Sequence, residues 1–434
     1  MVDDEGWFKA RRYLHFDMPI SEDVASRIVK NSVNVATNSF FPFIHYLIKS
    51  KKVKADPQSG NLLPSTKERE ICYASHCDSA IYSYYSHLLD VRYEHRVKRL
   101  SLGDTVLAFR ALGSSNIEFA KVAFDEIRSR GDCVAVAIDI SKFFNNLDHE
   151  ILKKQWCSVL EVDRLPKDHF AVFKSLTRYS YVERDALYAS LGIAKNNPKR
   201  GRKRVCSPDE FRDLVRAKGL ITTNKEACGI PQGSPISAML SNIYMLEFDV
   251  LLHKHAADSG GFYLRYCDDM LFIGPKGFED NINGVVRTQI KKLKLDINPT
   301  KTEIRYFSFE NGKLKADKPL QYLGFIFDGQ RVLIRSAALS RFSEKMSKGV
   351  RLARLSMRKS NRKKTELGLL EDNLFKKKIY KRYSYLGKQN FLSYGYRAAS
   401  IFQSTAIRKQ LKPLWGRLKK EIDKAPIVKS KKSS

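Results

Sequence analysis

Two adjacent carboxylates, Asp268 and Asp269, interrupt the apolar run YLRYCDDMLFIG at 263–274. A third carboxylate, Asp139, ends the apolar run CVAVAI. Ionised carboxylates beside buried segments are costly unless a cation meets them, and like charges at close range do not all stay ionised alone. Oxygen ligands without His or Cys favour Mg²⁺, with Mn²⁺ as the alternative, so the three aspartates predict a divalent metal site.

Paired metal ions would give these aspartates a definite chemistry. One ion would activate an attacking hydroxyl and the other would stabilise the leaving oxygen of an in-line phosphoryl displacement. Aspartate is also a common turn residue, so the pair taken alone is compatible with an ordinary hairpin turn. Other motifs in the chain must decide between a metal site and an ordinary hairpin turn.

The chain is strongly basic, and its charge is concentrated in one region. Its 434 residues include 78 Lys and Arg against 47 Asp and Glu, a formal net charge of +31. The stretch 331–434 alone holds 29 basic and six acidic residues. A basic region of this kind indicates a polyanionic partner, and the 11% aromatic content favours nucleic acid over a membrane surface.

Composition also bounds the class of protein. A hydrophobic content of 43% is ordinary for a folded globular chain, and no apolar run approaches the roughly 18 residues that cross a bilayer. The first residues, MVDDEGW, are acidic and lack the pattern of a signal peptide, which favours the cytoplasm and no membrane. Seven scattered cysteines predict reduced thiols.

The elements that must position the aspartates predict a mixed α+β fold. The run at 133–140 is typical of a strand covered on both faces, and 263–274 predicts a strand, a tight turn and a strand. Further strands are expected in 293–308 and 321–329. The loop GIPQGSP leads into a helix that Ser234 could cap.

The basic region after Arg331 predicts amphipathic helices. One helical face collects the apolar residues Leu339, Phe342, Met346, Val350, Ala353 and Met357. The basic residues lie away from that face, where few acids can pair with them. An ordinary surface helix explains the apolar face, but the unbalanced charge favours a nearby phosphate backbone.

Five motifs in this chain resemble, in order and spacing, those of reverse transcriptases. The motifs are DISKFFNNLDH (139–149), GIPQGSPIS (229–237), YCDD (266–269), LDINPTKTEI (295–304) and YLGF (322–325). The resemblance covers about Val106 to Phe327 and implies a right-hand polymerase fold. Such a fold has fingers, a palm with an antiparallel sheet plus helices, and an α-helical thumb.

The resemblance also implies a division of the chain. Residues 1–90 would be a mostly helical N-terminal extension, and 91–138 the fingers. Residues 139–332 would be the palm, with a basic insertion around 158–228. Residues 333–434 would form a basic α-helical thumb and tail.

By the same resemblance, Asp139 and Asp268 would hold two Mg²⁺ ions with Asp269 as a supporting carboxylate. The Ile140 carbonyl would be an extra ligand. Phe144 would pack against the sugar of the incoming nucleotide and exclude a 2′-hydroxyl, so the product would be DNA. A place in the core remains the competing interpretation of this aromatic residue.

Further positions would contact nucleotide, primer or template. Gln232 would contact substrate and template, Arg110 would clamp the triphosphate, and Lys301 would protonate the departing pyrophosphate. For Arg110 and Lys301 a solvated surface position is a competing interpretation. The primer would be gripped by Tyr322, Leu323 and Gly324. The nucleic-acid backbone would meet basic residues of the thumb and of the loop NNPKRGRKR, namely Arg341, Lys345, Lys348, Arg351, Lys199, Arg200, Arg202 and Lys203.

The N-terminal segments 12–17, 71–89 and 109–124 resemble bacterial antiphage defence reverse transcriptases of the "unknown groups", the stand-alone second type in particular. These defence enzymes belong to the same superfamily as group II intron and retron reverse transcriptases. The His/Cys-rich nuclease tail of many group II intron proteins and the VTG triplet of retron enzymes are not found in this sequence. The resemblance implies a structured non-coding RNA as template and scaffold, dNTPs as substrates, and a cDNA product that can be concatenated. A group II intron-type or retron-like enzyme, a template-independent self-primed DNA polymerase and a non-enzymatic maturase-like RNA-binding scaffold remain alternatives.

Overall fold

The computed structural model describes residues 6–55 and 61–424. The chain divides into two compact units. The first unit comprises 1–110, 138–272 and 280–302, and the second comprises the rest. The predicted tail after residue 424 lies outside the described residues.

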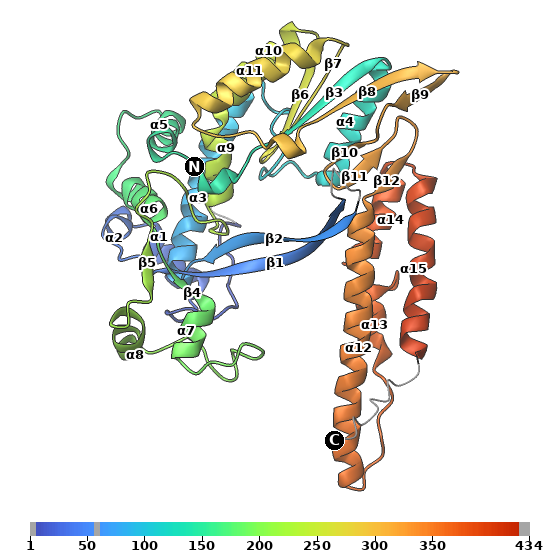
Figure 1. Cartoon of the computed structure of the whole chain (residues 1–434). Helices are drawn as coiled ribbons and strands as arrows, with labels where there is room; N and C mark the ends of the chain where they lie inside the picture. Colours follow the sequence, from blue (N-terminus) through green and yellow to red (C-terminus); the bar gives the residue numbers. More distant parts are fainter. Residues whose placement is uncertain (1–5, 56–60, 425–434) are drawn as a thin grey trace. The chain divides into compact units, whose positions relative to one another are not determined.

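The first unit is mostly helical, with strands in two places (Figure 1). Strands β3 and β7 and helix α11 contribute residues to both units. Its elements in chain order are α1 (Glu22–Val29), α2 (Ser32–Ala36), β1 (Phe43–Ala55), β2 (Leu62–Tyr73), α3 (His76–Arg99), η1 (Phe143–Asn145), α5 (His149–Leu160), α6 (Lys167–Thr177), β4 (Ser180–Glu183), α7 (Arg184–Ser190), α8 (Pro208–Glu210), η2 (Phe211–Arg216), β5 (Ile221–Thr223), α9 (Ser237–Tyr244), α10 (Leu246–Asp258), β6 (Phe262–Tyr266), β7 (Asp269–Gly274), α11 (Phe278–Lys292) and η3 (Pro299–Lys301).

The N-terminal region contains a long hairpin that the sequence analysis did not predict. Strands β1 and β2 pair antiparallel from Ile44–Tyr73 to Ala55–Leu62, so the expectation of a mostly helical extension is wrong for this stretch. The segment FIHYLI combines aromatic and β-branched residues, which favour strands. The predicted boundary at residue 90 falls inside α3 (His76–Arg99).

A hydrophobic core joins the N-terminal segment to the predicted basic insertion. Leu14 and Phe16 share this core with Val205 and Cys206, which directly follow the basic loop. The Val205 amide also donates to the His15 carbonyl at 2.7 Å. The end of the basic loop is therefore fixed to the N-terminal segment by burial and by a main-chain hydrogen bond.

Stability depends on pH through His15, a fully buried residue between Leu14 and Phe16 of this core. Burial lowers the pKa of His15 to about 3 from its usual 6.5. Between these values the unfolded chain binds more protons, so the free energy of unfolding falls as pH drops below 6.5, by up to about 1.4 kcal/mol per pH unit. We expect His15→Phe to lose this part of the pH dependence in urea unfolding at about pH 7 and about pH 5.5. Equal pH dependence in parent and variant would contradict the assignment.

The site strands belong to a five-stranded sheet of order β6-β7-β3-β8-β9. Strand β3 (Cys133–Asp139) is buried along nearly its whole length, as predicted for this run. It pairs antiparallel with β8 (Glu303–Glu310). Strand β3 starts at Cys133 and so precedes the predicted start of the palm at 139. The predicted hairpin at 263–274 is confirmed as β6 and β7, and the mixed α+β class is confirmed.

The second unit packs helices around a small antiparallel sheet, β10-β11-β12. Its aromatic core stacks Phe124 on Phe327 and places Phe325 against Phe402. Its further elements are α4 (Asn116–Arg130), β9 (Lys313–Ala316), β10 (Leu320–Tyr322), β11 (Phe325–Phe327), β12 (Val332–Ile334), α12 (Ser336–Glu366), α13 (Lys376–Tyr383), α14 (Phe391–Ile401) and α15 (Thr405–Asp423).

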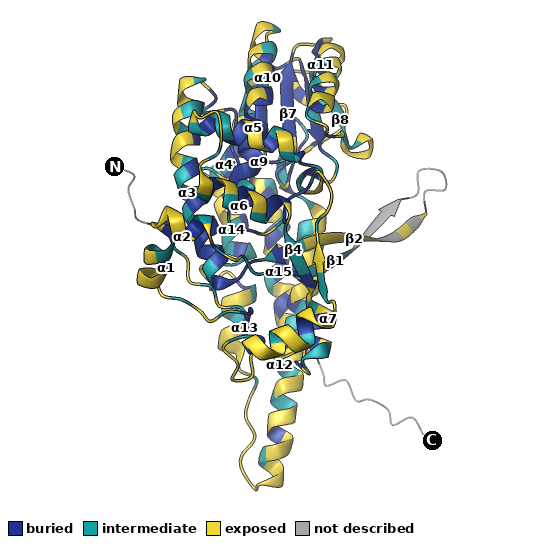
Figure 2. Ribbon diagram, turned by 90° about the vertical axis from the view of Figure 1, so that its left-hand side faces the viewer, coloured by how far each residue is buried: buried dark blue, intermediate teal, exposed yellow. Residues whose placement is uncertain are grey.

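Helix α12 confirms the predicted amphipathic pattern. Phe342, Met346 and Val350 are buried, whereas most of the helix surface is exposed (Figure 2). Within the described ranges, none of the helices combines the length and the apolar character needed to cross a bilayer.

Candidate active site

The three aspartates stand at the ends of neighbouring strands in the first unit. Asp139 is the last residue of β3, Asp268 lies in the turn between β6 and β7, and Asp269 is the first residue of β7. Asp139 is 8% exposed, Asp268 is half-buried and Asp269 is exposed. The turn contains Cys267 in the left-handed region, with φ of 61°.

The carboxyl groups act on one another electrostatically. Burial raises the pKa of Asp268, and the charge of Asp139 adds to the rise. Although the residue Asp269 is exposed as a whole, desolvation of its carboxyl group, followed by the charges of Asp268 and Asp139, raises its pKa to about 7. The structure therefore brings together the three predicted aspartates in a cluster that would gain from a bound cation.

The donor set fits a metal ion that is shared with substrate. Among residues 6–55 and 61–424, no three His, Cys, Asp or Glu side chains are arranged as a ready-made metal cage. Mg²⁺ is usually held by one or two carboxylates together with substrate phosphates and water, so a complete protein cage is not required. Asp139 and Asp268, both oxygen donors, fit such an ion.

Two further predicted residues lie beside Asp139. The Lys301 ammonium, at the end of η3, donates to Asp139 Oδ2, so this lysine supplies positive charge directly to the cluster. Ile140 forms an antiparallel bridge with Ile297. In this bridge the Asp139 carbonyl accepts from the Asn298 amide at 2.8 Å. The Ile140 carbonyl takes no part in this hydrogen bond.

Phe144 is only partly buried, whereas its neighbour Phe143 is 3% exposed. The two rings lie 5.5 Å apart, centroid to centroid, at 58°. The Phe144 carbonyl accepts from the Ile230 amide at 2.9 Å, which ties η1 to the loop GIPQGSP. Phe143 is thus a core residue, and Phe144 keeps a face that a sugar could contact.

The loop 229–236 is held from two sides. The Gln232 carbonyl accepts from the Cys72 amide at 2.8 Å, while the Gln232 residue remains partly exposed. Gly233 has φ of 112°, and a Cβ there would lie 2.7 Å from the Cys72 carbonyl oxygen. This close approach requires glycine.

The helix after this loop begins later than predicted. Helix α9 starts at Ser237 with Ile236 at its N-cap, so the expectation that Ser234 caps it is wrong. Residues before Ile236 stay in the loop because the Ser237 hydroxyl donates back to the Pro231 carbonyl at 2.7 Å.

Arg110 is a buried side chain, whereas a phosphate-binding arginine would need to be exposed. Its side chain is 4% exposed and forms a two-pronged ion pair with Glu94 at 2.7 and 2.8 Å. The same guanidinium donates to the Gly103 and Val106 carbonyls at 2.7 and 2.6 Å. A triphosphate clamp would require Arg110 to leave these partners, and that assignment stays a prediction.

The predicted primer-contacting residues form the tight connection between β10 and β11 in the second unit. Tyr322 is buried, and Leu323 and Gly324 adopt φ of 45° and 93°. The Leu323 carbonyl accepts from the Asn116 side chain at 2.9 Å. The predicted thumb residues are exposed on α12, namely Arg341, Lys345, Lys348 and Arg351.

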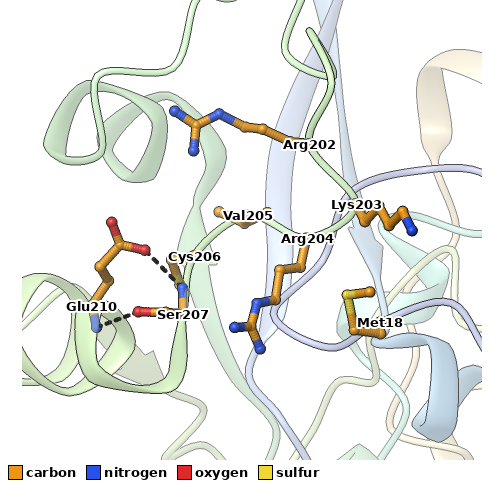
Figure 3. A pocket seen from close by; sticks show the side chains of 8 residues that line it. All are labelled: Met18, Arg202, Lys203, Arg204, Val205, Cys206, Ser207 and Glu210. Atoms are coloured by element: carbon orange, nitrogen blue, oxygen red, sulfur yellow. Dashed lines mark hydrogen bonds between the residues drawn. The ribbon is translucent and has the colours of Figure 1, made fainter.

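The basic loop lines an open hollow of about 540 Å³ in the first unit (Figure 3). Arg202, Lys203 and Arg204 contribute to its lining, and Lys199 and Arg200 are exposed just before them. The nearest acid in the lining is already engaged, because a Glu210 carboxylate oxygen accepts from the Ser207 amide at 2.7 Å. The predicted cationic loop is thus present and anchored.

Sequence reasoning missed the charged pair of Arg265 and Asp249. Both side chains are fully buried behind the YCDD turn. The available signal was an arginine inside an apolar strand, which requires a buried acid as partner.

Comparison with known proteins identifies a family match in the part of the chain that contains the three aspartates. Residues 96–327, more than half of the chain, match a family model described as "Reverse transcriptase (RNA-dependent DNA polymerase)". The structure is similar to telomerase from Candida albicans in complex with the TWJ fragment of telomeric RNA, with 12% identity, a TM-score of 0.41, and coverage of 93% of this chain and 66% of that one. It is also similar to apo telomerase from Candida tropicalis truncated from its C-terminal domain, with 12% identity, a TM-score of 0.39, and coverage of 73% and 61%. The chain therefore spans about two thirds or less of the length of these proteins, and the likeness carries no argument about function.

Proposed function

Because the chain belongs to the reverse transcriptase (RNA-dependent DNA polymerase) family, we propose that it copies a structured non-coding RNA into cDNA in bacterial antiviral defence. The observation that carries the polymerase assignment is the cluster of Asp139, Asp268 and Asp269 within the matched region. The defence assignment is supported by the resemblance of the N-terminal segments alone.

The proposed chemistry places two Mg²⁺ ions on Asp139 and Asp268, with Asp269 and the Ile140 carbonyl in support. Reverse transcriptases generally use divalent metal ions, which supply Lewis-acid stabilisation and an activated 3′-hydroxyl. Phe144 would exclude ribonucleotides, and Gln232 would contact the incoming nucleotide. Lys301, which donates to Asp139 in this structure, would protonate the departing pyrophosphate.

The proposed RNA partner would contact the anchored basic loop, and the primer–template duplex would contact α12. Exposed basic side chains on an anchored loop favour binding of a phosphate backbone. Little conformational entropy is lost on binding, because the end of the loop is already ordered. Lys199, Arg200, Arg202 and Lys203 would meet the RNA outside the duplex. Such contacts position the RNA without reading its sequence.

A direct experiment tests this proposal. The protein is purified from its native host, and the bound nucleic acid is sequenced. One abundant structured RNA, together with complementary DNA, is the expected result. Random DNA attached to a tyrosine would instead indicate a self-primed, template-independent polymerase, and RNA without any cDNA would favour a maturase-like scaffold.

Neutralising the basic loop is expected to weaken RNA binding. For Arg202→Gln, Lys203→Gln and Arg204→Gln combined, we expect about tenfold lower affinity for the structured RNA and a salt slope reduced by about 2. The measurement is filter binding over a series of salt concentrations. The control replaces three exposed lysines elsewhere in the first unit by glutamine, namely Lys154, Lys167 and Lys218. Equal losses in both triple variants would show that only net charge matters.

A further inference from the structure

A buried ion pair lies directly behind the YCDD turn. Arg265 of β6 and Asp249 of α10 have fully buried side chains, and two parallel bonds join them at 2.7 and 2.5 Å. The Tyr263 hydroxyl donates a third bond to Asp249 at 2.9 Å. Burying a charged pair is a weak source of stability, because desolvation offsets the attraction. Stability alone therefore does not explain why this pair stands here.

The remaining guanidinium nitrogen of Arg265 reaches the turn itself. Arg265 Nη1 donates to the Cys267 carbonyl at 3.0 Å and to Asn242 Oδ1 at 3.2 Å. Cys267 adopts the left-handed conformation, which residues other than glycine rarely take, and it directly precedes Asp268. A charge-assisted bond to its carbonyl holds this unfavourable turn in place.

The pair is itself fixed to the rest of the first unit. The Arg265 amide donates to the Thr105 carbonyl at 2.8 Å, and the Leu107 amide donates to the Arg265 carbonyl at 2.9 Å. The Asn242 side chain donates to the Ala108 carbonyl at 2.9 Å. Asn242 of α9 and Asp249 of α10 thus meet at the guanidinium, and segment 105–108 holds the Arg265 main chain and the Asn242 side chain.

We propose that Arg265 is a positioning residue for catalysis. Held by Asp249, its guanidinium fixes the Cys267 carbonyl and thereby the orientation of Asp268 and Asp269. This inference rests on the proposed polymerase function, since it assigns the pair a part in that reaction. Arginine is required because its fork engages both carboxylate oxygens and still reaches the turn, which the single ammonium of lysine cannot do.

Arg265→Lys tests the proposal while keeping a positive charge beside Asp249. We expect a melting temperature within about 3 °C of the parent, a kcat lowered about 100-fold because the carboxylates are misplaced, and a KM for dNTP changed by less than about threefold. The assay is dNTP incorporation on an RNA template with a DNA primer. The matched control is Arg96→Lys in α3, whose arginine pairs with Glu161 at 3.5 Å, and it should keep the parent kcat.

A second variant separates positioning from folding. Asp249→Leu combined with Arg265→Met removes both charges, and an apolar replacement of a buried pair commonly preserves stability. Its kcat should fall as in Arg265→Lys, because the Cys267 carbonyl has again lost its donor. Parent-level kcat in either folded variant, or activity loss that merely follows loss of folded protein, would overturn the proposal. Failure of the proposed function would instead appear in the parent protein, as absent incorporation.

Discussion

Replacing Asp268 and Asp269 together by alanine is expected to abolish Mg²⁺-dependent dNTP incorporation, by at least about 10³-fold. The reason is that the variant removes both carboxyl groups on which the charge of Asp139 acts, and with them the proposed metal ligands. Affinity for RNA should stay within about twofold, because the proposed RNA contacts are made by cations elsewhere. Primer extension and filter binding on the same preparations give both values.

The double variant also becomes two charges more positive, which needs its own control. Asp163→Ala combined with Asp258→Ala makes the same change in charge at exposed sites in the first unit. This control should incorporate dNTPs like the parent. Incorporation by the Asp268→Ala, Asp269→Ala protein within tenfold of the parent would contradict the catalytic assignment and favour a scaffold.

Replacing Phe144 by alanine is expected to increase the use of ribonucleotides. The partly exposed ring would no longer block a 2′-hydroxyl, so the preference for dNTP over rNTP in kcat/KM should fall by at least about tenfold. Single-nucleotide incorporation with dNTP and rNTP measures both constants. An unchanged ratio would refute the assignment of Phe144 as the sugar-selecting residue.

The neighbouring aromatic residue gives a matched control for this change. Phe143 is 3% exposed, so Phe143→Leu should lower the melting temperature through lost packing. Its preference for dNTP should remain that of the parent. A shift in preference from this core change would indicate that the discrimination comes from η1 as a whole.

Much of the candidate site could be predicted because its signals are local. An apolar run ending in Asp139 predicted β3, and two apolar runs separated by CDD predicted the hairpin of β6 and β7. Both predictions depend on the contrast between apolar and acidic residues within a few positions of the sequence. The periodicity of α12 was similarly visible, since its apolar residues recur at helical spacing.

The N-terminal hairpin was missed because its local pattern is ambiguous. Residues 43–55 mix an apolar half with a lysine-rich half, which resembles neither an alternating strand nor an amphipathic helix. Pairing with β2 decides the conformation, and register between two strands is a property of the fold. Tertiary context here overrides the local pattern.

The partners of the buried arginines could not be predicted from the sequence, for a related reason. Arg110 resembles a solvated or phosphate-binding residue in sequence, but Glu94 and two carbonyls engage it. Arg265 depends on Asp249, which lies on a different element. Long-range partners determine whether a charge is buried, and spacing along one sequence does not reveal them.

The central claim is that Asp139 and Asp268, distant in sequence, together hold the metal ions at a growing DNA end. Anomalous scattering from Mn²⁺, in a crystal of the protein with an RNA template, a DNA primer and an incoming dNTP, tests it most directly. Mn²⁺ peaks bonded to carboxylate oxygens of both residues and to the triphosphate are the expected result. Metal bound to the triphosphate, with either carboxylate outside bonding distance, would contradict it.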